Sequence, residues 1–387
     1  GEMIQDNKGA LSNCMKIIIS KVEDPRVLNR SKHSLLDILG ITFCAMMSGA
    51  KSFLEIEEFA YERKEWFESF LELKGGIPSH DTLMRVFSIL DPNEVHAALT
   101  EWSLSLIGKN PIKRICMDGK SIEGTERTFT PGTHCLHILN VYASDHGITL
   151  GQLKANSSGL GEIKPMKEML KILNIKKALI SVDAGGSVPS MSRAIREKHG
   201  DYILPIKLNQ KLSHEEIKEK FIKHPFKESA SNKKLDCYQL EEKGHGRIDK
   251  RMCSVISAKE FSEEFHNNWK DVKSIIRLTR VRETKDKSLS RKLKTGTDVR
   301  ITESTVYYIS SKILSAEKAI HHIREHWSIE NNLHWQLDVA LGEDDWSVRA
   351  KKMALNLCAV RKVIYNILKQ EPSKGSMKRK IKRAGWN

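Results

Sequence analysis

Between residues 114 and 207, short apolar runs of strand character alternate with segments of helical period. Two runs flank Asp145-His146-Gly147 and predict a β-hairpin with a glycine turn. Strands that alternate with helices of this length build an α/β sheet with some parallel pairs. We therefore predict an α/β fold with strands over 114–118, 135–144, 148–155, 177–184 and 202–207, and helices over 162–175 and 189–198.

The segments on either side of this alternation have different characters. Apolar residues recur at spacings of three and four ahead of it, whereas strand-like pieces and a basic polar loop follow it before a last strand and two long helices. The predicted organisation is a disordered N-terminus (1–10), a small all-helical domain (11–108), the first part of the core (109–207), a β-rich insertion (208–302), the second part of the core (303–371, with a strand over 304–311 and helices over 315–338 and 347–370) and a basic tail (372–387).

The helical segment over 11–108 has clear helix starts. Pro78-Ser79 and Asp91-Pro92 each place a capping side chain just ahead of an apolar-periodic stretch. Several short helices joined by brief turns could form a DNA-reading helix-turn-helix or a protein-interaction domain. Residues 1–110 carry a net charge of −4, which weakens the DNA interpretation, and both roles stay open.

The rest of the chain is strongly basic. The whole sequence has a formal charge of +15, so residues 111–387 carry +19. Much of it is concentrated at 271–300, with +6, and at 351–387, with +10. Such an excess favours a polyanionic partner, and 40% hydrophobic with 29% charged residues excludes a disordered or collagen-like chain.

Cysteine usage and hydropathy indicate the compartment. The seven cysteines are an odd number, lie far apart and never form a C-x-x-C pair, which is typical of reduced intracellular thiols. No run of 18 apolar residues occurs, and the N-terminus is polar. We expect a cytoplasmic protein without a membrane partner.

Three acidic residues form the candidate catalytic site. Asp118 and Asp183 each end an apolar run, with Gly119 directly after the first and Gly185 two residues after the second, and ligands bind beyond the carboxyl ends of strands in α/β sheets. Taken alone, each aspartate is more simply a turn or capping residue. Together, the carboxylate oxygens of the two aspartates are suitable ligands for magnesium or manganese. Glu330 is the best third acid, because apolar residues at 329, 333 and 337 predict that its helix packs on the core.

The sequence motifs resemble those of a known family. The order of elements and the three acids are similar to the ribonuclease-H-like core of a DDE transposase. The segments IPSHDTLMRVFSILDP, MDGKSIEGT, GDYILPIKLNQ, EKGHGR, YYISS and HWSIENNLHWQLDV resemble the H-repeat-associated branch of bacterial insertion-sequence transposases, over roughly residues 20–372. The resemblance implies DNA cleavage and strand transfer at element ends with two divalent ions, Mg²⁺ or Mn²⁺ as its substitute, held by Asp118, Asp183 and Glu330.

The sequence departs from better-studied relatives around the glutamate. These carry an arginine four residues before it and a lysine seven after, where this chain has His326 and Leu337. His326, Glu330 and His334 also share a spacing of four, which could bind zinc. The H-E-x-x-H pattern of zinc hydrolases is absent, so we favour histidines that flank the active site or hydrogen-bond in the core.

Double-stranded DNA, as element ends and target, is the expected partner, bound by a homodimer at the bacterial nucleoid. Basic or polar side chains near the three acids, in the insertion and in the tail could clamp phosphates, although the insertion motif could equally be a solvated hairpin turn and the end of strand 202–207 an ordinary exposed end. Trp269 could stack on a displaced base or simply belong to the core. The candidate DNA contacts are Lys120, Lys207, Asn209, His245, Arg247, Arg251, Arg324, His326, His334, Lys378, Arg379 and Lys380.

Two other functions stay open. One is a metal-dependent nuclease of the same fold that cuts DNA without joining it. The other is a transposase-derived DNA-binding protein that has lost catalysis, which the three intact acids argue against.

Overall fold

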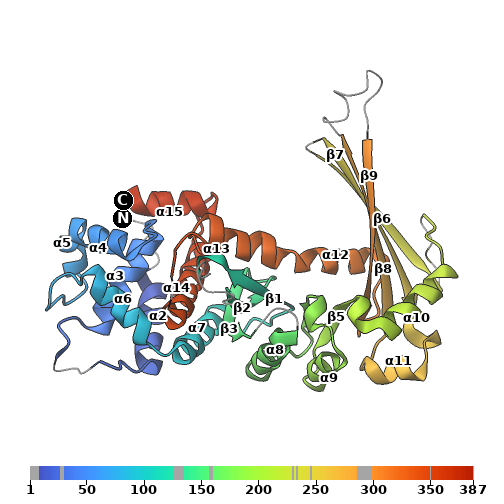
Figure 1. Cartoon of the computed structure of the whole chain (residues 1–387), viewed down its shortest axis with the longest axis horizontal. Helices are drawn as coiled ribbons and strands as arrows, with labels where there is room; N and C mark the ends of the chain where they lie inside the picture. The colour runs from blue at the N-terminus through green and yellow to red at the C-terminus, as the bar shows by residue number, and fades with distance from the viewer. Residues whose placement is uncertain are drawn as a thin grey trace. The chain divides into compact units, whose positions relative to one another are not determined.

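The computed structural model describes residues 8–26, 30–125, 135–156, 160–228, 231, 234–244, 246–285, 299–348 and 350–386 (Figure 1). The chain forms two compact units. The first contains Gly1–Pro165 and Ser328–Asn387, and the second contains Met166–Trp327. The structure confirms the mixed α/β class, and no helix in the described residues is long and apolar enough to cross a membrane.

Helices fill the described part of the first unit ahead of its first strand. Side chains of Ser34, Ser52, Ser79 and Asp91 accept backbone N–H groups at the starts of four of them, which confirms the predicted caps at Ser79 and Asp91. The first helix begins at Lys8, inside the segment expected to be disordered. The helices are α2 (Lys8–Lys21), α3 (Leu35–Met47), α4 (Phe53–Glu62), α5 (Lys64–Glu68), α6 (His80–Ile89) and α7 (Pro92–Ile107).

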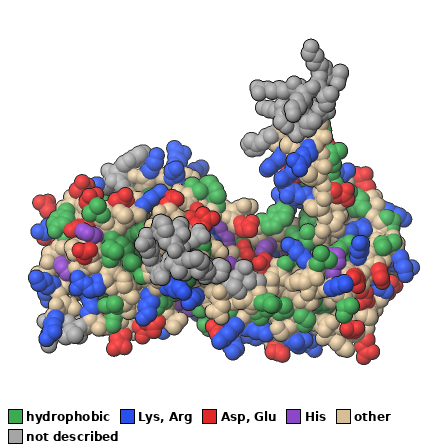
Figure 2. All heavy atoms as spheres, in the orientation of Figure 1, with side chains coloured by type: hydrophobic (Ala, Val, Ile, Leu, Met, Phe, Trp, Pro, Cys, Tyr) green, Lys and Arg blue, Asp and Glu red, His purple; other side chains and the backbone are tan. Residues whose placement is uncertain are grey.

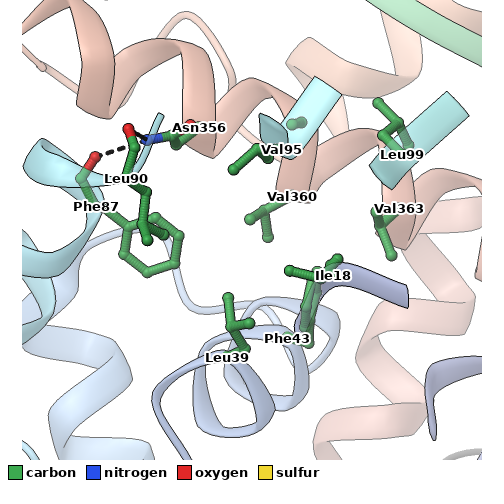
Figure 3. A pocket seen from close by; sticks show the side chains of 11 residues that line it. Ile18, Leu39, Phe43, Phe87, Leu90, Val95, Leu99, Asn356, Val360 and Val363 are labelled. Atoms are coloured by element: carbon green, nitrogen blue, oxygen red, sulfur yellow. Dashed lines mark hydrogen bonds between the residues drawn. The ribbon is translucent and has the colours of Figure 1, made fainter. Parts of the chain in front are cut away.

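A late helix, α14 (Lys351–Gln370), forms the centre of the first unit's core. It is buried along most of its length and packs against α3, α6, α7 and the third strand. Figure 3 shows apolar side chains from these helices around a space of about 10 Å³, room for one water at most. The Asn356 side chain donates hydrogen bonds to the carbonyls of Phe87 and Leu90, which fixes α14 to the end of α6.

The segment that the sequence analysis calls a basic tail (372–387) contains a helix. Helix α15 (Met377–Trp386) contacts α3 and α14. Its apolar residues Met377, Ile381 and Ala384 are buried in the first unit's core, so the segment is part of the fold. The sequence prediction missed this helix because Lys and Arg dominate its composition and hide the apolar spacing.

The strands of the first unit form an antiparallel meander. They are β1 (Arg114–Ile122), β2 (Leu136–Ala143) and β3 (Ile148–Ala155), in the order β3-β2-β1. The predicted hairpin is confirmed, and Gly147 in its turn has φ +66°, which glycine adopts at little cost. Strand β1 does not end at Asp118 as predicted, because its pairing with β2 continues to Ile122 opposite Leu136. The short η2 (Glu123–Thr125) follows.

Helix α8 (Leu160–Ile172) begins in the first unit and ends in the second. The second unit continues with β4 (Leu179–Val182), η3 (Ala184–Gly186), α9 (Pro189–Glu197), β5 (Asp201–Ile206), η4 (Leu208–Gln210) and α10 (Lys211–Ile222). Strands β4 and β5 pair in parallel, which confirms the predicted parallel component of the sheet.

Long antiparallel strands complete the second unit. They are β6 (Asp236–Gly244), β7 (Arg247–Ser257), β8 (Ser274–Lys285) and β9 (Val299–Ser310), in the order β5-β9-β8-β7-β6, with η5 (Ala258–Glu260) and α11 (Glu263–Asn268) between β7 and β8. Helix α12 (Ala316–His326) packs on β6, β7 and β8. The predicted strand over 304–311 is the second half of β9, whose last residues pair with β5 while its whole length pairs with β8.

A buried histidine gives the first unit a pH-dependent stability. The Nδ1 atom of His96 on α7 accepts the Gln152 backbone N–H at 3.3 Å, and burial, aided by Lys362, lowers the pKa of His96 to about 4. The unfolded chain therefore binds a proton that the folded chain excludes between pH 6.5 and 4.

We expect this proton to destabilise the protein as the pH falls through that window, by about 1.4 kcal/mol per pH unit. In urea unfolding at pH 6.5 and pH 5, His96→Gln should lose that part of the pH dependence. His321→Gln, at an exposed position, should keep it. Equal pH dependence in the wild type and His96→Gln would contradict the assignment.

Candidate functional site

Asp118 lies in the middle of β1 and is half-buried. Its Oδ1 accepts the backbone N–H of Gly119 at 3.0 Å, and its partner in the strand register is Asn140 on β2. Successive side chains on a strand point to opposite faces, so Asp118 shares a face of β1 with Lys120. The side chains of Asp118 and Lys120 can therefore contact residues that pack on the same face of β1.

Glu330 lies on a π-helical turn, η6 (Ile329–His334), which continues into α13 (Trp335–Val339). Its side chain is exposed, whereas Ile329, Leu333 and Leu337 are fully buried, as the sequence predicted for a helix packed on the core. The predicted continuous helix over 315–338 is thus interrupted. A π turn widens the helix and often marks a functional site.

The Glu330 segment, which consists of η6 and α13, is held on the sheet by two side-chain contacts. One comes from Asn140, the register partner of Asp118, and the other comes from Lys120. The Asn140 amide donates to Nε2 of His334 at 2.9 Å, four residues beyond the glutamate. The Lys120 ammonium contacts Asp338 on α13 and, in the loop that follows, Glu343 at 2.9 Å and Asp344 at 3.6 Å. Strand β1 accordingly packs against η6 in the first unit.

The link through Lys120 is part of a buried charge cluster. Glu343 is 1% exposed, and Lys362, Lys120 and Arg361 outweigh its burial and lower its pKa to about 2. Burial alone would lower the pKa of Lys120, but the carboxylates of Glu343 and Asp338 raise it above its usual range. Burial and a hydrogen bond to Asp344 raise the pKa of Asp338 to about 7, against the influence of Lys120.

Two predicted DNA contacts therefore belong to the protein interior. Lys120 is committed to the three acids. His334 is buried, and burial, aided by Lys120, lowers its pKa to about 3, so its neutral ring can accept the Asn140 amide. The sequence could not show this, because the partners of Lys120 lie more than 200 residues away along the chain.

A histidine–glutamate pair that the sequence did not reveal lies against Gly119. His137 Nε2 contacts Glu162 Oε1, and the other ring nitrogen of His137 lies 3.1 Å from Ser121 Oγ. A Cβ at residue 119 would overlap both atoms of the pair. Glycine is therefore needed at position 119 because the His137 and Glu162 side chains approach the backbone closely.

Asp183 directly follows β4 in the second unit and caps η3. Its Oδ1 accepts the Gly186 backbone N–H at 3.2 Å, and its carbonyl accepts the Ser187 hydroxyl at 2.9 Å. The capping interpretation of this aspartate is therefore correct. It does not compete with a second role, because a carboxylate offers about four acceptor positions.

Two predicted DNA contacts brace the surroundings of Asp183. The Asn209 amide donates to the Ala184 carbonyl at 3.2 Å, which fixes η4 to the turn after Asp183. His326, at the end of α12, places Nδ1 2.5 Å from Ser181 Oγ on β4, two residues before Asp183. Lys207, between β5 and η4, is exposed.

Arginines crowd the far ends of the long strands of the second unit, where Figure 2 shows a group of Lys and Arg side chains. Asp249 binds Arg282 at 2.7 Å, Arg280 at 3.2 Å and, more loosely, Arg247 at 3.6 Å. Arg247 is half-exposed and remains able to reach a ligand. His245 lies outside the described residues.

The predicted DNA contacts Arg251 and Arg324 share the exposed Glu242 as a partner. Both contact the carboxylate of Glu242, Arg324 at a distance of 2.5 Å. Arg251 is buried and its guanidinium also lies over the Trp327 ring, 5.5 Å from the centroid. Arg251 thus stabilises the packing of α12 on β7 and is not a surface contact, whereas Arg324 remains partly exposed.

Of the predicted contacts on α15, two are exposed and one is not. Lys378 and Arg379 face solvent, as does the neighbouring Lys382. Lys380 is buried, and its ammonium donates to the carbonyls of Leu368 at 2.9 Å and Glu371 at 2.6 Å. Lys380 therefore caps the end of α14, where a cation is favourable, instead of contacting DNA.

One alternative from the sequence is wrong, and a second gains no support. Trp269 is fully buried and donates to Ser213 Oγ at 2.9 Å, so it cannot stack on a displaced base. For the zinc alternative, Nε2 of His334 is engaged by the Asn140 amide. Within the residues that the structure describes, no three His, Cys, Asp or Glu side chains gather as a metal site.

Comparison with known proteins identifies the class. The Transposase DDE domain model matches residues 109–367, and the DDE_Tnp_1-associated model matches residues 17–103. The chain belongs to the DDE transposases and is an enzyme of the transposase class.

The relatives specify the branch. The chain is 34% identical to "Putative transposase YncI" of Escherichia coli O157:H7, over 95% of this chain and 91% of that protein. It is 31% identical to "H repeat-associated putative transposase YhhI" of Escherichia coli K12, over 95% and 94% of the two chains. The chain is thus an insertion-sequence transposase of the H-repeat-associated branch, as the motifs predicted.

The close approach at Gly119 can be tested by adding one methyl group. Gly119→Ala should lower the free energy of unfolding by about 1–3 kcal/mol, because the His137–Glu162 pair must move. Gly244→Ala is the matched control on a strand, since nothing lies within 4 Å of its Cβ position. Urea unfolding measures both. Equal midpoints for the two variants would contradict the assigned contact.

Proposed function

We propose that this transposase cuts DNA at the ends of an insertion sequence and joins the freed 3′ end to target DNA. The observation that carries the proposal is the pair of links, Asn140–His334 and Lys120–Glu343, that hold the Glu330 segment on the strand of Asp118. In this proposal Asp118, Asp183 and Glu330 are the metal-binding acids of a ribonuclease-H-like core. The helical region over 11–108 and the β-rich region over 208–302 are its accessory domains, and the basic segment over 372–387 supplies DNA contacts.

The three acids fit the metal that the family resemblance implies. Asp118 and Asp183 are half-buried and Glu330 is exposed, so each retains access to solvent. Carboxylate oxygens suit Mg²⁺ or Mn²⁺, and Mg²⁺ binds through one or two protein carboxylates together with water and substrate phosphates. A preformed cage of protein ligands is therefore not required. Two bound ions would activate the attacking oxygen and stabilise the leaving oxygen.

The protein's own contribution is positioning. In cleavage a water oxygen forms a bond to phosphorus and the P–O3′ bond at the element end breaks. In strand transfer the freed 3′-hydroxyl oxygen forms a bond to a phosphorus of the target DNA, and the P–O3′ bond of the target breaks. In each step the attacking oxygen loses a proton and the leaving oxygen gains one. Because this reaction depends on orientation and charge stabilisation, the links around Asp118 and the cap at Asp183 serve to hold the carboxylates in place.

Exposed cations are the proposed DNA contacts. Lys207, Arg247, Lys378 and Arg379 face solvent or are half-exposed and can reach phosphates. Arg324 and His326 lie near the end of α12 and could contribute once DNA is bound. We expect a homodimer to bind element ends and target DNA at the bacterial nucleoid.

One relative bears on the alternative of a transposase-derived DNA-binding protein that has lost catalysis. The chain is 39% identical to "Inactive transposase YbfQ" of Escherichia coli K12, but only over 70 residues, 18% of this chain. The presence of all three acids and their supporting contacts favours an active enzyme.

The metal acids can be tested one at a time. Asp118→Asn, Asp183→Asn and Glu330→Gln should each lower the rate of metal-dependent cleavage of a labelled element end by about a thousandfold or more, the loss of several kcal/mol of transition-state stabilisation. DNA binding should persist. Glu58→Gln, an exposed acid on α4, is the control. Cleavage at the wild-type rate by any of the three variants would exclude that residue, and nicks without a strand-transfer product would favour the nuclease.

The exposed face of α15 provides a separate test of DNA binding. Deleting the segment would remove the buried Met377 and Ile381, so neutral substitutions are cleaner. The triple variant Lys378→Gln/Arg379→Gln/Lys382→Gln should weaken binding to all DNA sequences. It should also reduce the slope of log affinity against log salt by up to about 3.

The matched control is Lys64→Gln/Lys74→Gln/Arg85→Gln, which neutralises three exposed cations of the mildly acidic helical region. Its affinity and slope should stay close to wild type. An unchanged slope in the α15 variant would show that this helix does not contact phosphates.

A further inference from the structure

The contact between Lys120 and three carboxylates bears directly on the geometry of the proposed metal site. Lys120 stands two residues after Asp118, on the same face of β1. Its side chain is 9% exposed, and its partners Asp338, Glu343 and Asp344 all follow Glu330 within 14 residues of sequence. One ammonium thus joins the strand of one proposed metal ligand to the segment of another.

A second contact repeats the same connection. The backbone N–H of Glu123, at the end of β1, donates to Asp344 Oδ1 at 3.1 Å. The side chain of Lys120 and the backbone N–H of Glu123 therefore both bind the loop after α13. The Glu330 segment cannot slide along β1 without breaking these bonds.

The ammonium of Lys120 is already paired within the protein. It contacts Asp338, Glu343 and Asp344, and the buried carboxylate of Glu343 also interacts with Arg361 and Lys362. Buried charges are costly unless they are paired, and removing one partner leaves the others uncompensated. Lys120 is hence poorly suited to leave the cluster for a phosphate, and well suited to fix the segment that it contacts.

We propose that Lys120 is a positioning residue of the metal site, which holds the Glu330 segment against the strand of Asp118. This inference rests on the proposed function. Lys120 acts through the backbone segments that carry two of the proposed ligands, and we expect its substitution to lower metal affinity by about the 10- to 100-fold that is typical of groups that orient metal ligands.

The test compares Lys120→Met, Lys120→Arg and the exposed Lys154→Met on the same sheet. Mn²⁺ binding to the DNA-free protein is followed by electron paramagnetic resonance, and cleavage is measured against metal concentration. Lys120→Met should weaken Mn²⁺ binding and raise the metal concentration for half-maximal cleavage about 10- to 100-fold. Lys120→Arg should recover most of the loss, and Lys154→Met should match wild type.

A phosphate-contact role would give the opposite pattern. Lys120→Met would then weaken DNA binding and reduce the salt slope by about 1, with Mn²⁺ binding unchanged, and this result would overturn the proposal. If Lys120→Met fails to fold, Asp338→Asn is the substitute, because it removes one partner while Glu343 still pairs with Lys120. It should shift Mn²⁺ binding in the same direction by a smaller factor, and unchanged binding would overturn the proposal.

The two proposals fail in different ways. A wild-type protein that never cleaves DNA with metal would refute the proposed function, whereas the role of Lys120 is judged on Mn²⁺ binding without DNA. Equal Mn²⁺ affinity of wild type and a folded Lys120→Met protein would refute the positioning role even if cleavage is normal.

Discussion

The pairing of buried Lys120 with Glu343 is the interaction on which the proposed site depends. Glu343 is held ionised by three nearby cations despite its burial. Because these charges compensate one another, the loop after α13 stays attached to β1, and with it the turn that carries Glu330. The Asn140–His334 hydrogen bond makes the same attachment from the neighbouring strand. Removing one partner from a buried cluster of this kind leaves an uncompensated buried charge, which is strongly destabilising.

The cationic side chains of this protein are of two kinds. Some are buried and stabilise the fold, and others are exposed and can contact DNA. Lys120, Arg251 and Lys380 are buried and bonded to carboxylates or carbonyls, and they brace β1, β7 and α14. Lys378, Arg379 and Arg247 remain accessible. The net charge of +15 is therefore a poor guide to the number of phosphate contacts. Counting only exposed side chains among the predicted contacts leaves Lys207, Arg247, Lys378 and Arg379 as the proposed phosphate contacts.

Local patterns predicted much of the fold and of the site. The alternation of apolar runs and helical periods located β1, β4 and β5, and the apolar spacing around Glu330 predicted its buried helix face. Two kinds of feature could not be predicted. The end of β1 depends on pairing with β2, and the partners of Lys120 and of Gly119 come from distant segments. A π turn likewise has no periodic signal, because it interrupts the helical spacing at a single turn.

The central claim is that Asp118, Asp183 and Glu330 bind the same divalent ions. The most direct test replaces Mg²⁺ with Fe²⁺ and generates hydroxyl radicals at the bound ion, which cut the protein backbone nearby. The account predicts cuts close to residues 118, 183 and 330 in the same preparation, all suppressed by excess Mg²⁺. Cuts confined to one of these segments, or cuts that excess Mg²⁺ does not suppress, would contradict it.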